Sequence, residues 1–538
     1  MVSNLQPSDP PVTAPSHEVR TLIDDLLAEQ GRLQTPAAKF AEVHDREPDL
    51  ADHYRSLIPL TKPGKNEQYA FEVSLDRCTG CKACVSACHN LNGLDDDESW
   101  RDTGALLGGE TTPAWQQTVT TACHHCESPE CMHGCPVGAY EKDEDTGIVR
   151  HLDDQCIGCS YCILKCPFDV PKYSEARGIV RKCDMCHQRL AEGEAPACVQ
   201  ACPTEAIRII KVPTNIPAIP ERRRTEHEKN LFQPTTPNPQ SGLPSSNITF
   251  PTTRYVGRNV PTTAIAADRD QLTPEHAHWP LVFMLVLTQV GIGLVGSAGL
   301  QPSASSAPLY LGTLLFNAGM IAAVFHLGQP HKAWRFFLGL RTSWLSREIL
   351  AFSLFAPIPL VLCALPLLPE FPFKEYVSML VQASVLPVGL LAVFTSVMIY
   401  ADTRRSLWAV PLSAPRFFGT VFTFLLLGAS IEIPLLRPVA AVAIALKTLP
   451  ELWVLRLAEL DTDWSPLRHS ARLLLGPLGN ITFWRFALAA LAMAAVIFSP
   501  WFALPLLLAS EILERQLFFQ AVQAPKMPGT FGPAHPTH

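Results

Sequence analysis

The chain has 538 residues, more than a single ordinary domain holds, and its composition changes near residue 275. Residues 277–538 are apolar with a net charge of +5, whereas residues 1–276 are polar with a net charge of −12, which argues against nucleic-acid binding. No apolar segment with a cleavage site and no twin-arginine pattern stands near Met1, so we expect neither an exporting signal nor disulfides.

The first 68 residues are predicted to form a disordered tail followed by a helical arm. Apolar residues recur at helical spacing at Leu22, Ile23, Leu26 and Leu27, which predicts short helices between residues 17 and 60. We expect this arm to pack against the following domain or against a partner.

Cysteines define the next domain, residues 69–212, which holds sixteen of the seventeen cysteines in four motifs. The motifs are C-x2-C-x2-C-x3-C at Cys78, Cys81, Cys84 and Cys88; C-x2-C-x4-C-x3-C at Cys123, Cys126, Cys131 and Cys135; C-x2-C-x2-C-x3-C at Cys156, Cys159, Cys162 and Cys166; and C-x2-C-x11-C-x3-C at Cys183, Cys186, Cys198 and Cys202. The first and third have the spacing of bacterial ferredoxins, whose fourth cysteine ligates the other cluster of a pair. Four motifs therefore predict four [4Fe-4S] clusters in an α+β ferredoxin-like domain of two tandem dicluster units.

Structural zinc is the alternative use of these cysteines. Zinc sites prefer two separated C-x2-C pairs, often with histidine, and three-cysteine loops of this kind fit them poorly. His89, His124, His125 and His187 lie beside the cysteines, and we expect them to hydrogen-bond to cluster sulfur or to be exposed.

At residues 70–212 the chain resembles the four-cluster iron–sulfur subunit (DmsB-like) of dimethyl-sulfoxide-reductase-type molybdoenzymes. The resemblance rests on the four motifs and on stretches such as Cys-Thr-Gly-Cys-Lys-Ala-Cys at 78–84 and Arg-Lys-Cys-Asp-Met-Cys at 181–186. It implies four ligand sets, namely Cys78, Cys81 and Cys84 with Cys202; Cys183, Cys186 and Cys198 with Cys88; Cys123, Cys126 and Cys131 with Cys166; and Cys156, Cys159 and Cys162 with Cys135. It also implies that the cluster built on the third motif lies nearest the membrane.

The rest of the chain is predicted to be a linker, a membrane domain and a tail. Residues 213–275 are Pro-rich, and we expect them to lie extended on the surface of the cluster domain. Residues 276–522 are predicted to form an all-α polytopic membrane domain of about eight transmembrane helices, with seven as the alternative, and residues 523–538 a tail. The apolar segments are 280–300, 308–328, 349–368, 379–400, 417–436, 438–457, 481–499 and 501–519.

The membrane half resembles the membrane anchor subunit (DmsC-like) of the same enzymes. The matching stretches are His326-Leu327-Gly328-Gln329-Pro330, Ser343-Trp344-Leu345-Ser346-Arg347-Glu348, Met398-Ile399-Tyr400-Ala401 and Ser510-Glu511-Ile512-Leu513-x-Arg515. In relatives the two parts are separate subunits that assemble around a catalytic subunit, so the resemblance implies a fusion of two subunits.

Ionisable side chains at membrane depth are costly, and they are functional candidates by default. A quinone needs hydrogen-bond partners for its carbonyls and a proton carrier, and His326 and Glu348 provide both. The resemblance implies the same two positions. Arg347, and Glu432 inside the fifth segment, are added as tentative quinone residues. The alternative is that such groups snorkel to the interface or form structural ion pairs.

Two further expectations concern the membrane half. Glu511 and Arg515 stand four residues apart in a predicted helix and are expected to share a face and pair. A bis-histidine haem needs two axial histidines at membrane depth, and only His326 lies in or at the end of a predicted segment. The outlying histidines are His276, His278, His331 and His469. We therefore expect no haem.

The positive-inside rule predicts the orientation. Basic residues, Arg416 and Arg485 among them, gather in and beside the loops after the second, fourth and sixth segments. This predicts a multi-pass protein of the bacterial cytoplasmic (inner) membrane whose cluster domain faces the cytoplasm. Export together with a signal-bearing partner is the alternative.

These features together predict an electron-transfer and membrane-anchor subunit of a molybdopterin oxidoreductase complex. Molybdopterin and substrate chemistry are expected on a separate catalytic subunit, and no residue of this chain is assigned to catalysis. Two kinds of complex fit this prediction, namely sulfite dehydrogenase-like and sulfoxide or N-oxide reductase-like enzymes. The first kind is favoured by analogy, because its active site faces the cytoplasm. The alternatives are a stand-alone ferredoxin:quinone oxidoreductase and a metal-stabilised redox sensor.

Overall fold

The structure, a computed structural model, describes residues 22–32, Lys39, Glu42, 54–96, 98–108, 115–214, 241–258, 260–261, 263–300, 306–460 and 463–529. The chain divides into two compact units, Met1–Ser56 and Leu57–His538. In the first unit, α1 (Leu22–Arg32) confirms a helix in the expected arm, and Leu22 and Ile23 are exposed on it. The expected disordered tail lies outside the described residues.

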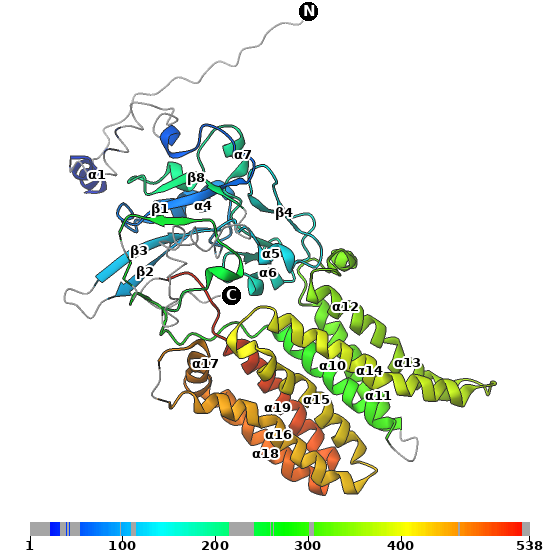
Figure 1. Cartoon of the computed structure of the whole chain (residues 1–538). Helices are drawn as coiled ribbons and strands as arrows, with labels where there is room; N and C mark the ends of the chain where they lie inside the picture. The colour runs from blue at the N-terminus through cyan, green and yellow to red at the C-terminus, as the bar shows by residue number, and fades with distance from the viewer. Residues whose placement is uncertain are drawn as a thin grey trace, which may run out of the picture. The chain divides into compact units, whose positions relative to one another are not determined.

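The cysteine-rich half of the second unit contains, within its described residues, two three-stranded sheets and two short hairpins (Figure 1). The first sheet has the order β8 (Ile207–Pro213), β1 (Glu67–Ser74) and β9 (Arg254–Val256), and the second has the order β10 (Ile265–Ala266), β2 (Asp102–Gly108) and β3 (Trp115–Thr121). The hairpins are β4 (Tyr140–Lys142) with β5 (Val149–His151) and β6 (Lys172–Ser174) with β7 (Ile179–Arg181).

Short helices follow or lie within the cysteine motifs. They are α4 (Ala83–Asn92), α5 (Glu130–His133), α6 (Tyr161–Lys165), α7 (His187–Ala191) and α8 (Ala197–Gln200). Between the sheets lies a core that includes Val73, Leu106, Val119 and Tyr255. This arrangement confirms the α+β cluster domain that the motifs predict.

The predicted linker contributes strands to the cluster domain. β9 pairs parallel to β1, and β10 pairs antiparallel to β2, so the described part of the linker lies on this domain as expected. Strands of three and two residues are too short to show an alternating pattern, which is why the sequence did not predict them. The run Arg222–Arg224 lies outside the described residues.

The C-terminal segment also returns to the cluster domain. The backbone N–H of Ala105 in β2 donates to the Gly529 carbonyl at 3.0 Å, and the N–H of Gly529 donates to Asp268 Oδ1 at 2.9 Å. Met527 is buried in the same core as Val73. The residues after α19 therefore lie against β2 and do not form a free tail over their described part.

The second half of this unit is all helical. Its long helices are α10 (Trp279–Ala298), α11 (Ser306–Val324), α12 (Trp344–Phe355) continued by α13 (Pro357–Ala364), α14 (Lys374–Ala401), α15 (Val410–Ala429), α16 (Arg437–Arg456), α18 (Gly479–Phe498) and α19 (Pro500–Gln520). The short helices are η1 (Arg55–Leu57) and η3 (Ser246–Ile248) in the earlier part, and η4 (Pro330–Gly339), η5 (Leu365–Leu367), η6 (Ser406–Trp408), η7 (Pro434–Leu436) and α17 (Pro466–Leu475) here.

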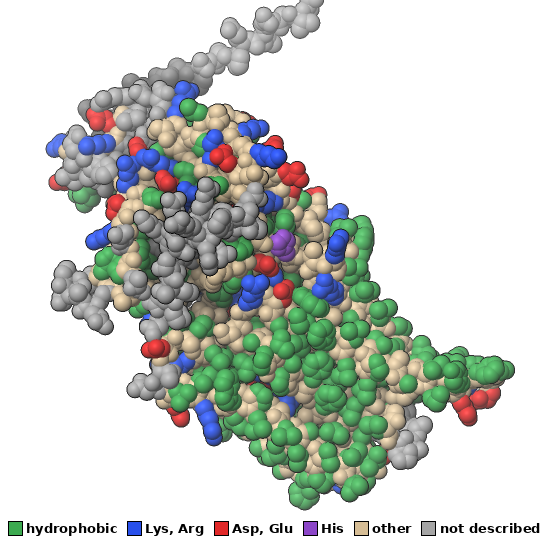
Figure 2. Space-filling view, in the orientation of Figure 1, with side chains coloured by type: hydrophobic (Ala, Val, Ile, Leu, Met, Phe, Trp, Pro, Cys, Tyr) green, Lys and Arg blue, Asp and Glu red, His purple; other side chains and the backbone are tan. Residues whose placement is uncertain are grey.

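Seven helices in the described part of the chain are long and apolar enough to cross a membrane. They correspond to the first seven predicted segments, and apolar side chains cover the helical half (Figure 2). α19, the eighth predicted segment, is a helix of 21 residues but carries Glu511, Glu514 and Arg515 and falls outside this set.

Several helix boundaries in the membrane half differ from the predicted segments. α15 begins at Val410 rather than 417: Pro411 lies in its first turn, where the missing N–H group costs little, and the helix continues through Pro415. The third span bends where α12 meets Pro357. The sequence did not predict α17 either, because its polar face is typical of a loop.

α10 is the centre of the bundle. Of the seven candidate spans it is the most buried, and it packs against α11, α14, α15 and α19. Small residues permit this: a Cβ at Gly291 would lie 2.7 Å from the Gly312 carbonyl oxygen, and one at Gly293 would lie 2.5 Å from that of Val421.

Candidate functional site

Each cysteine motif forms a loop that includes left-handed backbone conformations. These occur at Gly80 and Lys82, at His125, at Gly158 and Ser160, and at Met185 and Cys186. Such turns aim successive N–H groups to one side and create an environment for anions. Accordingly, the N–H of Gly158 donates to Cys156 Sγ at 3.3 Å and that of Met185 to Cys183 Sγ at 3.4 Å.

The first and fourth motifs lie together. Cys78, Cys81, Cys84 and Cys202 line one cavity of about 300 Å³. In the metal-free chain, burial raises the pKa of the Cys88 thiol to about 12, and the nearby thiols of Cys198 and Cys186 act in the same direction. Cys88 thus stands beside cysteines of the fourth motif rather than those of its own.

The second and third motifs form a corresponding pair. Burial raises the pKa of Cys126 well above its ordinary value, and the thiols of Cys123, Cys166 and Cys131 act in the same direction. Burial raises the pKa of Cys162 likewise, with contributions from Cys159, Cys156 and Cys135. Cys166 thus lies beside cysteines of the second motif, and Cys135 lies beside cysteines of the third.

Buried cations lie among the thiols. Arg101 is 2% exposed and interacts with Cys84, Cys88, Cys183 and Cys198. Lys182 is equally buried, and its Nζ lies 3.6 Å from Cys123 Sγ. A buried charge needs a counter-charge, and an iron–sulfur cube held by four thiolates supplies negative charge at both places.

The donor set fits clusters better than single ions. Among the described residues, no three His, Cys, Asp or Glu side chains converge closely enough to hold one metal ion. The buried atoms Arg101 Nη2 and His125 Nε2 also lack a hydrogen-bond partner in the described part of the chain. Buried polar atoms rarely stay unpaired, so both fit beside an additional group.

The loop of the third motif packs directly on the membrane half. His326 Nε2 lies 3.1 Å from the Cys159 carbonyl oxygen, and the Gln329 N–H donates to the Ile157 carbonyl at 3.0 Å. A carbonyl only accepts, so Nε2 is the donor and His326 Nδ1 is left with a free lone pair. Burial lowers the pKa of His326 to about 4, which keeps its imidazole neutral.

Three glycines allow this close approach. A Cβ on Gly328 would overlap the Gly178 carbonyl, and a Cβ on Gly158 would overlap the same group. Gly158 and Gly178 also have φ of 68° and 64°, which disfavours side chains. The stretch that follows α11, which carries the first part of the anchor resemblance, therefore packs backbone against backbone on the cluster domain, beside the side-chain contacts of His326 and Gln329.

Glu348 lies near the same contact. It is buried in α12 and accepts a short hydrogen bond from Ser396 of α14. Tyr161 of the third cluster loop lies within electrostatic reach of Glu348, and its hydroxyl donates to the Ile399 carbonyl at 3.2 Å. Tyr400 lies within similar reach of Glu348. The structure thus brings His326 and Glu348 to the same cluster loop.

A buried ion triad joins the two halves next to these residues. Lys165 Nζ lies 2.5 Å from Glu130 Oε2 and 2.8 Å from Asp402 Oδ2, and the lysine side chain is 4% exposed. Ser343 and Ser346 of the membrane half also donate to carbonyls of the loop at 134–136. The position of the third cluster loop over α12 and α14 is therefore fixed by charge and by hydrogen bonds.

The two tentative quinone residues lie elsewhere. Arg347 donates to the Leu340 and Arg341 carbonyls and lies over the Trp344 ring, away from Glu348. Glu432 is not inside the fifth helix, since α15 ends at Ala429; it follows the end that is farther from the cluster domain. A 20-residue helix is about 30 Å long, so Glu432 is not joined to the His326 region.

The expected pairing of Glu511 with Arg515 is wrong. Glu511 instead binds Lys447 and lies 3.4 Å from Arg485, whereas Arg515 pairs with Glu514 at 3.4 Å. Arg485 and Arg416, which were counted with the basic loops, are buried inside α18 and α15. An ion pair between residues four apart on one helix is weak, so the partners from other helices are preferred here.

Sequence reasoning missed Tyr161, Asp402 and Lys447. No sequence pattern marks Tyr161 or Asp402, because their roles arise from contacts between segments that are distant in the chain. Lys447 did carry one, since a lysine in the middle of an apolar segment is costly unless it is paired.

Comparisons with known proteins agree with this architecture. Residues 114–212 match the 4Fe-4S dicluster domain family, and residues 274–498 match the DMSO reductase anchor subunit (DmsC) family. Over 148 residues the sequence is 43% identical to the B subunit of anaerobic dimethyl sulfoxide reductase from Escherichia coli K12, a match covering 26% of this chain and 72% of that protein. This protein belongs to the family of dimethyl sulfoxide reductase iron–sulfur subunits.

Two further relatives have similar identities. The B subunit of anaerobic dimethyl sulfoxide reductase from Haemophilus influenzae is 38% identical over 150 residues, 26% of this chain and 73% of that protein. The thiosulfate reductase electron transfer subunit PhsB of Salmonella typhi is 39% identical over 144 residues, 26% of this chain and 74% of that protein. The present chain fuses such an iron–sulfur electron-transfer part to a DmsC-type membrane anchor, and it is a multi-pass membrane protein.

Proposed function

We propose that this fused DMSO reductase-type chain conducts electrons between a separate molybdopterin-containing catalytic subunit and the quinone pool. Four [4Fe-4S] clusters on the sixteen cysteines, in the sets described above, form the path. The clusters supply one-electron redox steps when bound, while the chain's own residues hold them apart from water and position the end of the path. Electron exchange with quinone takes place beside His326 and Glu348.

The observation that carries the proposal is the contact between the third cluster loop and the membrane half. The Cys159 carbonyl of this loop accepts a hydrogen bond from His326, and its Tyr161 lies within electrostatic reach of Glu348. A quinol hydroxyl can donate to His326 Nδ1, while Glu348 accepts the proton released on oxidation. His326 lies beside the cluster ligand Cys159, which keeps the distance for electron transfer short.

The same proposal covers topology. α19 packs along α18 and ends on the cluster-domain side, so we infer that it is the eighth crossing, with its charges paired internally. The basic residues of the loop at Pro330–Gly339 lie on the side of the cluster domain, which supports a cytoplasmic cluster domain. Arg416 and Arg485 are buried inside helices and therefore do not contribute to the positive-inside rule.

Two measurements test the proposal. Full-length chain purified in detergent should contain about sixteen irons and no stoichiometric zinc, and menadiol should reduce its clusters. Glu348→Gln and His326→Gln should slow that reduction by at least about tenfold, with iron content unchanged. Wild-type rates in both variants would place quinone elsewhere.

The catalytic partner is tested separately. Pull-down from native membranes in mild detergent should recover a large molybdopterin protein, and its identity assigns the substrate, whether sulfite, a sulfoxide or an N-oxide. Cys81 is exposed, so electrons can enter near the first ligand set. Recovery of a small ferredoxin in place of a molybdenum protein favours the stand-alone ferredoxin:quinone oxidoreductase.

A further inference from the structure

A group of seven charged side chains lies buried inside the second part of the helix bundle. This charge network consists of Arg416, Lys447, Glu451, Arg485, Glu511, Glu514 and Arg515. They come from α15, α16, α18 and α19, and each is at most 7% exposed. Four cations face three carboxylates, so one positive charge in the network has no carboxylate of its own.

The contacts divide the charge network into two parts. In one, Arg485 Nη2 lies 3.0 Å from Glu451 Oε1, and Glu511 joins Arg485 to Lys447. In the other, Glu514 lies between Arg515 at 3.4 Å and Arg416 at 3.6 Å. The distances around Glu514 are the longer ones, so its carboxylate is held more loosely than that of Glu451.

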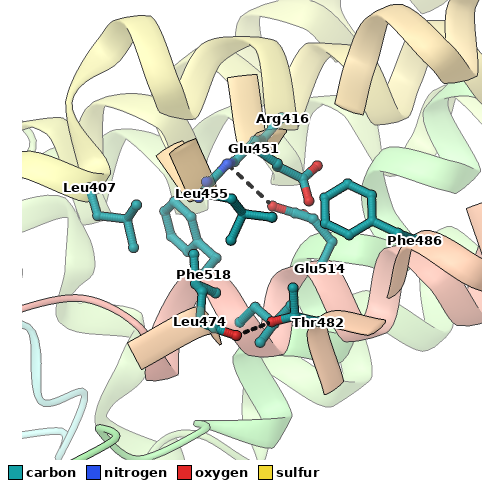
Figure 3. Close-up of a pocket in the computed structure, with 10 residues that line it drawn as sticks. Leu407, Arg416, Glu451, Leu455, Leu474, Thr482, Phe486, Glu514 and Phe518 are labelled. Atoms are coloured by element: carbon teal, nitrogen blue, oxygen red, sulfur yellow. Dashed lines mark hydrogen bonds and ion pairs between the residues drawn. The ribbon is translucent and has the colours of Figure 1, made fainter. Parts of the chain in front are cut away.

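A cavity separates the two parts. Arg416, Glu451, Glu514 and Thr482 line it together with apolar side chains, and both carboxylates border it (Figure 3). Leu474 of α17 forms one wall, and Thr482 Oγ1 donates to the Leu474 carbonyl at 2.8 Å. The cavity is large enough and polar enough to hold water, and it lies just beneath the short helix α17.

Unpaired polar atoms continue from this cavity toward the proposed quinone site. Arg515 Nη2 donates to Gln289 Oε1 at 3.1 Å, but Arg515 Nε and Nη1 and Gln289 Nε2 have no hydrogen-bond partner among the described residues. Both side chains are fully buried. Buried donors of this kind are normally satisfied by ordered water, so water belongs between α10 and α19.

Tyr400 connects this position to Glu348. It lies within electrostatic reach of both Glu348 and Arg515. Its ring packs on Phe518, with centroids 5.1 Å apart, and Arg515 lies over the neighbouring Phe417 ring at 3.9 Å. Apolar rings therefore enclose the line from Glu348 to Glu514, and proton-bearing groups are spaced along it.

We propose that Glu514 and Tyr400 form a water-assisted proton route between the cavity beneath α17 and Glu348. This inference rests on the proposed function, because it needs quinone chemistry at Glu348. When a quinol is oxidised, its two electrons pass to the clusters and its two hydroxyl protons leave one at a time. Each proton goes to Glu348, then to the Tyr400 oxygen as that hydroxyl releases its own proton, then through water at Arg515 and Gln289 to Glu514 and the cavity. Quinone reduction uses the same groups in reverse.

The route has a physical reason. The cluster domain covers the end of α12 through the Ser343 and Ser346 contacts, so Glu348 does not open directly to water there. Protons must then cross protein of low dielectric constant. The excess positive charge of the charge network stabilises the negative charge of a carboxylate or tyrosine that is transiently deprotonated.

The test uses full-length chain with its clusters in lipid nanodiscs, mixed with menadiol in weak buffer. Cluster bleaching reports electron transfer, and a pH-indicator dye reports proton release. Glu514→Gln and Tyr400→Phe should each slow both signals by about tenfold or more, while iron content and the affinity for a hydroxyquinoline N-oxide inhibitor stay at wild-type values. Glu514→Asp should restore most of the rate. Glu375→Gln, a carboxylate at the far end of α14, is the control and should not change it.

The outcomes separate the two proposals. Wild-type rates in Glu514→Gln and Tyr400→Phe, whatever their thermal stability, make the charge network purely structural and overturn the route. If Glu514→Gln does not assemble, Tyr400→Phe decides alone, because phenylalanine keeps the ring packing. If Glu348→Gln also reduces at the wild-type rate and the inhibitor still binds to it, the quinone site itself is misplaced. If only Glu348→Gln is slow, the quinone site stands and the route fails.

Discussion

The ion triad at Lys165 makes a quantitative prediction about the contact between the two halves. In Lys165→Met, Glu130 and Asp402 lose the ammonium that lies 2.5 and 2.8 Å from their oxygens. Removing one partner of a fully buried pair costs about 3–5 kcal/mol. Because the Glu130 and Asp402 side chains are 18% and 31% exposed, water recovers part of that loss, and we expect about 2–3 kcal/mol.

That energy corresponds to a roughly 30- to 140-fold larger population of the open contact. Hydrogen–deuterium exchange followed by mass spectrometry measures it on peptides that cover α6 and the loop after α14. The control is Arg150→Met, which removes a more exposed pair with Glu141 in the same domain. That change should raise exchange by no more than about fivefold. Equal exchange in the two variants would refute the argument that the triad holds the halves together.

Three further changes test other features. Gly328→Ala should displace the stretch after α11 from the Gly178 carbonyl and slow menadiol oxidation by at least about tenfold, whereas Gly479→Ala, whose Cβ meets nothing within 4 Å, should leave the rate unchanged. Arg101→Met should lower the potentials of the two nearest clusters by tens of millivolts in redox titrations followed by electron paramagnetic resonance, because a buried positive charge favours the reduced form. Arg485→Met should lower the thermal midpoint in detergent, since it strands buried carboxylates at a cost of about 3–5 kcal/mol; an unchanged midpoint would mean that water already screens them.

The sequence was most informative where chemistry is local. Metal-ligand spacing fixes which cysteines share a loop, whereas the assignment of the fourth cysteine of each set stays a prediction of the family resemblance. Helices of spanning length were predictable because lipid demands a continuous apolar run. Even so, the exact start of α15 was not, because a proline looks the same in the first turn of a helix as at its end.

The rest depends on contacts that no window of sequence contains. Glu511 and Arg515 have the right spacing to pair, yet Lys447 and Arg485 reach Glu511 from other helices. Asp402 looks like a residue of a solvated turn, and only the docked cluster loop turns it into a partner for Lys165. Residue spacing along one element is a weak guide wherever several elements converge on one buried charge.

The return of residues 522–529 to the β2 edge has a consequence for the order of assembly. β2 begins about four hundred positions before Gly529, so the hydrogen bond from Ala105 to Gly529 and the burial of Met527 form only after the last helix has been synthesised. Iron–sulfur cubes can therefore be delivered to an unfinished pocket while the anchor enters the membrane. A nascent chain that stalls before α19 lacks the Ala105–Gly529 hydrogen bond and the buried Met527 side chain, so its cluster domain is less completely packed than that of the finished chain.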